Sequence, residues 1–189
     1  KALPKVMGAL CSVFKRAISS AGQAVGPVLV PMLEGAVGAF EACQAMEALE
    51  VLTAAMETFG SGANTVSGLA APLGRALSSA LPFSTATSPE IIGAVFDLAH
   101  RALLFAPAAL FSSNAFQPLL GAASVAVRLR ERDAVRCALA FTSLAASGPH
   151  TPMRDPALVA QWQVHAEAAT SMVAKHSGVL VASLVAGIS

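Results

Sequence analysis

The strongest indication of the fold class comes from the stretch SPEIIGAVFDLAHRALLFAPAALF, residues 88–111. Ser88 is a suitable N-cap, Pro89 favours the first helical position, and Glu90 lies near the positive end of the helix that follows. Apolar residues then recur at spacings of three and four, as on one face of an amphipathic helix. The pattern predicts a helix over 89–105 whose apolar stripe packs on neighbouring helices: Ile91, Ile92, Val95, Leu98, Ala102 and Phe105.

The same helical periodicity extends over most of the chain, and it predicts an all-α protein. Of the 189 residues, 55% are hydrophobic and only 12% are charged, and much of the apolar content is alanine. Strand signals are weak, because the chain has no tyrosine and no Asn-Gly or Asp-Gly hairpin turn. We expect helices at 3–20, 25–40, 44–59, 63–82, 89–105, 113–128, 131–147 and 157–187.

The mean hydropathy of +0.65 is high for a soluble protein, and it raises the question of membrane insertion. The longest uncharged run, Ala102 to Val127, is long enough to span a bilayer. Polar residues and prolines interrupt its middle, among them Pro107, Asn114 and Pro118. We interpret this run as two shorter helical pieces joined by a polar turn. No membrane insertion is expected, although an alanine-rich helical membrane protein remains an alternative.

Charge and cysteine content exclude several classes of site. The formal net charge of +1 provides no overall field that would attract nucleic acid, so no direct nucleic-acid binding is expected. Cys11, Cys43 and Cys137 form no C-x-x-C pair, which argues against a disulfide framework or a zinc site. His165 and Glu167 form an H-x-E fragment, but the P-C-x-x-C element of zinc deaminases is missing. We therefore expect no enzyme, no metal and no cofactor.

A repeat of more than forty residues organises the predicted helices. Segments that begin Pro-Leu or Pro-Met occur at Pro31, Pro72 and Pro118, separated by 41 and 46 residues. Such spacing is typical of HEAT and armadillo units, which contain two or three helices in about 40–47 residues. We expect one α-solenoid segment over residues 1–189, part of a longer chain, built from HEAT-type antiparallel helix pairs at 25–59, 63–105 and 113–147, flanked by helices 3–20 and 157–187.

Two stretches resemble a known family. Residues 88–147, which begin SPEIIGAVFDLAHRALLFAP, follow the order of the C-terminal HEAT repeats of importin-β superfamily receptors, or karyopherins. That family shows a helix opening hPDxVxxhFxLhxxhLxxxP, where h is apolar, followed by two further apolar helices. Residues 10–40, LCSVFKRAISSAGQAVGPVLVPMLEGAVGAF, resemble the preceding repeat, and Pro27 falls on a family proline. The most similar branch is that of transportin-SR and importin-thirteen.

The resemblance implies a function in nucleocytoplasmic transport. Receptors of this family are curved solenoids that shuttle between nucleus and cytoplasm and carry protein cargo through nuclear pores under Ran-GTP control. The implied partners are therefore protein cargo, nuclear pore proteins and the Ran GTPase. In this family Ran is bound mainly by N-terminal repeats, so we expect Ran to contact parts of a longer parent chain. A HEAT scaffold subunit of another assembly is the alternative function.

The resemblance also points to a cargo site on the first helix. Transportin-SR has an arginine-rich inner helix that recognises Arg/Ser-rich cargo, often phosphorylated, and the matching stretch here is KALPKVMGALCSVFKRAIS. Gly8 and Cys11 occupy two of the family's arginine positions, which weakens the case for phosphorylated cargo. The alternative is an ordinary solvated helix face. The candidate cargo-binding residues are Lys1, Lys5, Lys15 and Arg16.

Two further charged groups have a functional and a structural interpretation. The segment RLRERDAVR, residues 128–136, is either a contact for an anion or an acidic peptide, or a solvated connection with local charge pairs. The predicted 44–59 helix and the residues just before it are acidic. They either bind a basic localisation signal or form a solvated face. These acidic residues are Glu41, Glu47, Glu50 and Glu57.

Overall fold

The computed structural model describes residues 3–62, 65–83, 88–149 and 155–188. All regular structure in these ranges is helical, as the periodicity predicts. The α-helices are α1 (Leu3–Ala21), α2 (Leu29–Cys43), α3 (Glu47–Phe59), α4 (Val66–Ala80), α5 (Pro89–Phe105), α6 (Pro107–Ser112), α7 (Phe116–Ala126), α8 (Arg132–Ser147) and α9 (Pro156–Ile188). Two 3-10 segments, η1 (Gly22–Val28) and η2 (Leu81–Phe83), join α1 to α2 and extend α4.

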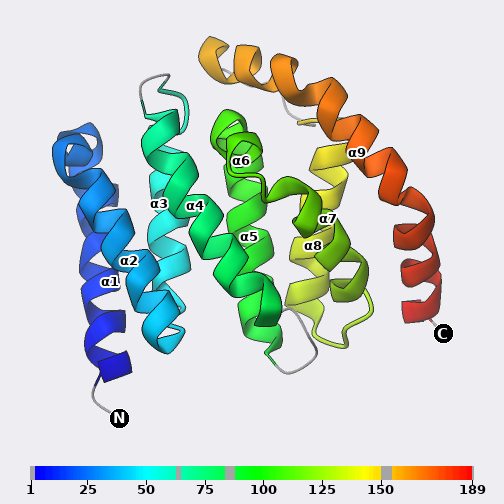
Figure 1. The fold of residues 1–189 in the computed structure, drawn as a ribbon, viewed down its shortest axis with the longest axis horizontal. Helices are drawn as coiled ribbons and strands as arrows, with labels where there is room; N and C mark the ends of the chain where they lie inside the picture. Colours follow the sequence, from blue (N-terminus) through cyan, green and yellow to red (C-terminus); the bar gives the residue numbers. More distant parts are fainter. Residues whose placement is uncertain (1–2, 63–64, 84–87, 150–154, 189) are drawn as a thin grey trace.

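The helices form two rows that pack against each other (Figure 1). In one row α1 contacts α3, α3 contacts α5, and α5 contacts α8. In the other row α2 contacts α4, and α4 contacts α6. The long helix α9 lies against α6, α7 and α8 and covers one end of the stack (Figure 1). The two inner helices of the first row, α3 and α5, therefore each bury one side on the helix before them in the row and another on the helix after them.

The core between the rows is apolar, and no polar or charged side chain is buried among the described residues. Alanines are numerous there, because a small side chain lets neighbouring helices approach closely. Aromatic rings form the bulkiest part, with the Phe141 ring on α8 5.9 Å from that of Phe96 on α5 and 5.7 Å from that of Phe116 on α7. These contacts join α5, α7 and α8.

The observed helix ends differ from the expected ones at several glycine, proline and asparagine residues. Gly22 ends α1 with φ +53°, a left-handed conformation that glycine adopts without strain. The expected helix at 25–40 begins instead as the 3-10 segment η1, because Pro27 lacks an N–H and disfavours α conformation before it. The expected turn before residue 113 is wrong, since Pro107 begins the short helix α6. Asn114, with φ +58°, then separates α6 from α7.

The long uncharged run from Ala102 to Val127 is divided among α5, α6 and α7, so it does not form one spanning helix. Two other helical stretches among the described residues are long and apolar enough to cross a membrane, Leu3–Cys43 and Pro156–Gly187. The first is interrupted by η1, which makes it a bent pair of helices. The second is α9, whose most apolar window is only 17% buried. The membrane alternative therefore depends on α9.

Candidate binding groove

A groove lies along the row formed by α1, α3, α5 and α8. It consists of two adjoining hollows of about 330 and 410 Å³, which share Glu50, Thr53 and Asp97 as lining residues. The smaller hollow extends to α1 through Lys15, and the larger extends to α8 through Glu131. The groove is therefore open across four helices, a shape suited to an extended segment of a partner.

Negative charge dominates this groove. The lining residues include six carboxylates and three cationic side chains, which leaves three negative charges without compensation. Burial raises the pKa of the Cys137 thiol, so this lining residue stays neutral near pH 7 and adds no charge. The carboxylates are Glu50, Glu57, Glu90, Asp97, Glu131 and Asp133, and the cations are Lys15, Arg101 and Arg136.

Ion pairs across the groove connect consecutive helices of the row. Lys15 Nζ lies 2.8 Å from Glu50 Oε2 and joins α1 to α3. Arg101 Nη1 lies 3.1 Å from Glu57 Oε1 and joins α5 to α3. Because these side chains remain about half exposed, each pair stabilises the fold by only about 0–1 kcal/mol. The pairs can therefore exchange with the charges of a bound partner at little cost.

The structure describes three of the four residues expected to bind cargo on the first helix. Lys15 points into the groove and pairs with Glu50. Lys5 and Arg16 are exposed, and eleven residues of helix place them only about 20° apart around the axis of α1. Lys1 lies outside the described residues. Binding by these four residues stays a prediction; of the three that the structure describes, Lys15 lines the groove, and Lys5 and Arg16 do not.

Gly8 and Cys11 face α3. Cys11 is 1% exposed, and burial together with nearby Glu47 raises the pKa of its thiol. A Cβ atom on Gly8 would lie 2.9 Å from Glu47 Oε1. Small residues at both positions therefore allow α1 to pack directly on α3, and a long side chain there would separate the two helices.

The four acidic residues singled out in the sequence lie at three different places in the structure. Glu50 and Glu57 line the groove. Glu41 lies in the other row, where its Oε2 is 2.7 Å from Arg75 Nη2. Glu47 is half-buried against Gly8. The groove also includes four carboxylates that the sequence did not assign to an acidic surface, because they reach it from α5, α8 and the turn before α8: Glu90, Asp97, Glu131 and Asp133.

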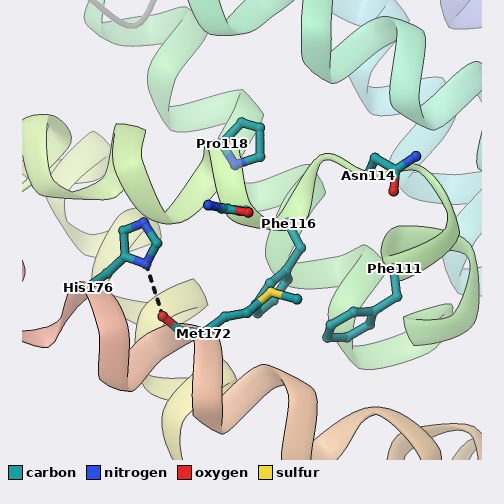
Figure 2. A pocket seen from close by; sticks show the side chains of 7 residues that line it. Phe111, Asn114, Phe116, Pro118, Met172 and His176 are labelled. Atoms are coloured by element: carbon teal, nitrogen blue, oxygen red, sulfur yellow. Dashed lines mark hydrogen bonds between the residues drawn. The ribbon is translucent and has the colours of Figure 1, made fainter.

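A second hollow, of about 550 Å³, lies between the α6–α7 turn and α9. Figure 2 shows the side chains that line it, with Met172 beside Phe116 and with the rings of Phe111 and His176 further apart. His176 Nδ1 is 2.9 Å from the carbonyl oxygen of Met172. None of the residues that line this hollow is an acid, a lysine or an arginine, which distinguishes it from the charged groove.

The H-x-E fragment has a packing role. The His165 ring stacks on Phe111, with centroids 4.6 Å apart and planes 6° from parallel. Burial lowers the pKa of His165, because the charged imidazolium is poorly solvated there. Glu167 is exposed. In the described part of the chain, no group of three or more His, Cys, Asp or Glu residues is placed to hold a metal ion.

Comparison with protein-family models, curated proteins and solved structures gives no match. The candidate site is therefore defined by the geometry and charge of this chain. In the groove, carboxylates and cations pair with one another across helices.

Proposed function

We propose that this chain is a segment of a HEAT-type α-solenoid that binds protein cargo in a nucleocytoplasmic transport receptor under Ran-GTP control. The observation that carries the proposal is the acidic groove across α1, α3, α5 and α8. The order of the helices supports the solenoid, since consecutive members of each row pack side by side. The resemblance of residues 10–40 and 88–147 to karyopherin repeats supports the choice of receptor.

The groove favours a basic segment of the cargo. Three uncompensated negative charges along one row attract a chain of lysines and arginines, and opposite charges increase both encounter rate and specificity. Because the carboxylates are partly exposed, each contact is weak, and affinity comes from several contacts along an extended segment. A basic localisation signal has this chemistry.

The groove is tested with the purified chain and a fluorescent lysine- and arginine-rich peptide, by anisotropy at several salt concentrations. We expect binding that weakens as salt rises, and weaker binding in Asp97→Asn and Glu90→Gln, which remove charge from the groove. Glu167→Gln is the matched control, because Glu167 is exposed on α9 and does not line the groove. Equal loss in all three variants would reject the groove as the site.

The transport role needs a separate experiment on the protein as cells produce it. We would isolate it from nuclear extract with its bound partners and add GTP-locked Ran. Release of partners by Ran-GTP supports an import receptor, and retention only with Ran-GTP supports an export receptor. Partners that are indifferent to Ran would favour the HEAT scaffold subunit.

The membrane alternative has one observation in its favour. Helix α9 has 33 residues and exposes Val179, Val181 and Val185. Flotation of the chain with liposomes tests this alternative directly. A chain that stays in the aqueous fraction without detergent would exclude it.

A further inference from the structure

Three arginines between the end of α7 and the first residue of α8 have no partner among the described residues. Arg128, Arg130 and Arg132 are exposed, and none forms an ion pair or side-chain hydrogen bond with another described residue. Most other described cations are paired, among them Lys15 and Arg101. Six described cations are therefore unpaired, and three of them belong to this segment, while Lys5, Arg16 and Lys175 lie elsewhere.

The carboxylates next to these arginines are engaged in local contacts. Glu131 Oε1 accepts a hydrogen bond from the backbone N–H of Asp133 at 3.2 Å and caps α8. Asp133 Oδ1 is 3.4 Å from Arg136 Nη2, one turn further along the helix. Neither carboxylate forms an ion pair with the three arginines, which keep their capacity for bidentate binding of an oxyanion.

The position of this turn relates the arginines to the acidic groove. Glu131 and Asp133 line the larger hollow at its α8 end. Arg130 and Arg132 are their direct neighbours in the chain, and consecutive Cα atoms are about 3.8 Å apart. Arginines thus alternate in the chain with the two carboxylates that line the α8 end of the groove.

We infer that the partner segment has two parts, a basic stretch that lies in the groove and an acidic stretch of Asp or Glu residues that binds Arg128, Arg130 and Arg132. This inference rests on the proposed function, because it assigns the basic stretch to the same groove. A segment with both charges gains affinity at both places. A purely basic segment is repelled by the arginines at the α8 end, so the arginines determine specificity.

A protein partner fits this surface better than a nucleic acid does. A polyanion of the length of the groove would reach the arginines only beside six carboxylates, which repel it. A peptide can place its acidic residues on the turn and its basic residues in the groove. Competition by duplex DNA therefore separates the two classes of partner.

The test compares two fluorescent peptides with the same basic stretch, one continued by glutamates and the other by glutamines. We expect the glutamate peptide to bind the wild-type chain about tenfold more tightly, because charged hydrogen bonds to arginine are gained. The Arg130→Gln/Arg132→Gln variant is expected to lose this difference while its affinity for the glutamine peptide stays the same or rises. Lys175→Gln, an exposed cation on α9, is the matched control and should keep the difference.

Each outcome has a defined meaning. Equal binding of the two peptides to the wild-type chain, or an advantage that survives in the double variant, overturns the inference and leaves the proposal of an acidic groove that binds a basic segment intact. No binding of either peptide rejects the proposed function itself. Displacement of the glutamate peptide by duplex DNA at equal concentration overturns the inference in favour of a nucleic acid. Unchanged circular dichroism spectra of the variants ensure that lost binding does not come from lost folding.

Discussion

The backbone of Gly60, just after α3, lies directly against the carbonyl group of Phe105 at the end of α5. A Cβ atom on residue 60 would collide with the Phe105 oxygen and would lie 2.6 Å from the Cβ of Ala106. This contact joins neighbouring helices of the row at one end, while the Arg101–Glu57 ion pair joins them on the groove surface. The close spacing of α3 and α5 requires glycine at position 60, because any other residue would place a Cβ atom in this contact. The width of the groove depends on the same spacing.

Gly60→Ala is therefore expected to destabilise the chain by about 3 kcal/mol or more, because the surrounding backbone cannot move aside. Urea unfolding followed by circular dichroism measures the change. Gly121→Ala is the matched control, since a Cβ there meets nothing within 4 Å and residue 121 lies inside α7. The control is expected to gain about 0.5–1 kcal/mol from the higher helix propensity of alanine. Similar effects at both positions would contradict the close contact of α3 with α5.

Phe141→Ala is expected to cost about 3–5 kcal/mol, because Phe141 is fully buried and its ring contacts Phe96 and Phe116. The loss follows from the cavity left between α5, α7 and α8. Leu139→Ala, on the same helix and 39% exposed, is expected to stay within about 0.5 kcal/mol of the wild type. The free energies of unfolding of both variants check this prediction, and a loss at Phe141 no larger than at Leu139 would be inconsistent with the packing.

Stability is expected to fall on acidification below pH 6.5. Burial lowers the folded-state pKa of His165 and, together with nearby Arg101, that of His100, both from the ordinary value of 6.5. As the pH falls, these histidines are protonated at a higher pH in the unfolded chain than in the folded one. In this range the unfolded state therefore binds more protons, and the free energy of unfolding increases with pH. Urea midpoints at about pH 8 and about pH 5.5 measure the difference.

The variant His165→Phe separates the contribution of His165 from that of other groups. Phenylalanine preserves the stacking on Phe111 but does not titrate, so the loss of stability between the two pH values should become smaller. A variant with the same acid sensitivity as the wild type would show that His165 does not contribute.

Lys15→Gln is expected to increase the affinity of the groove for a basic peptide. Lys15 Nζ lies 2.8 Å from Glu50 Oε2 and neutralises that carboxylate. Removing the lysine charge leaves Glu50 free to pair with the partner. Lys5→Gln serves as the control, because Lys5 is exposed on another side of α1. Anisotropy titrations compare the three proteins. Lower affinity for an acidic or phosphorylated peptide in both variants, with no effect on the basic peptide, would instead favour the cationic cargo site on the first helix.

The chain is expected to self-associate at high concentration through α1. Four residues on its outer side, at helical spacing, have exposed fractions between 41% and 62%: Leu3, Val6, Leu10 and Val13. Such an apolar stripe on a helix surface favours association. Leu10→Glu should shift the sedimentation coefficient towards that of a monomer, and Val125→Glu, exposed on α7, is the control. A wild-type chain that is monodisperse at all concentrations would contradict this expectation.

The sequence alone determined the helical class and the extent of the most periodic elements. Helix α5 covers residues 89–105 as expected, because Ser88, Pro89 and the apolar stripe act within a single segment. Local signals of this kind operate over a few residues and need no tertiary contact. They were ambiguous where left-handed residues end a helix, as Gly22 and Asn114 do, since the same residues also occur in ordinary turns.

Only the tertiary structure decided which charged residues meet. Glu50, Asp97 and Glu131 are distant in the sequence and belong to α3, α5 and the turn before α8, yet they line one groove. Lys15 and Arg16 are adjacent in the sequence, but neighbouring residues of a helix point about 100° apart, so only Lys15 reaches Glu50. Helix periodicity specifies which residues share a face. Which faces come together depends on the packing of small residues such as Gly8 and Gly60 against neighbouring helices, and on the burial of apolar side chains that this packing allows.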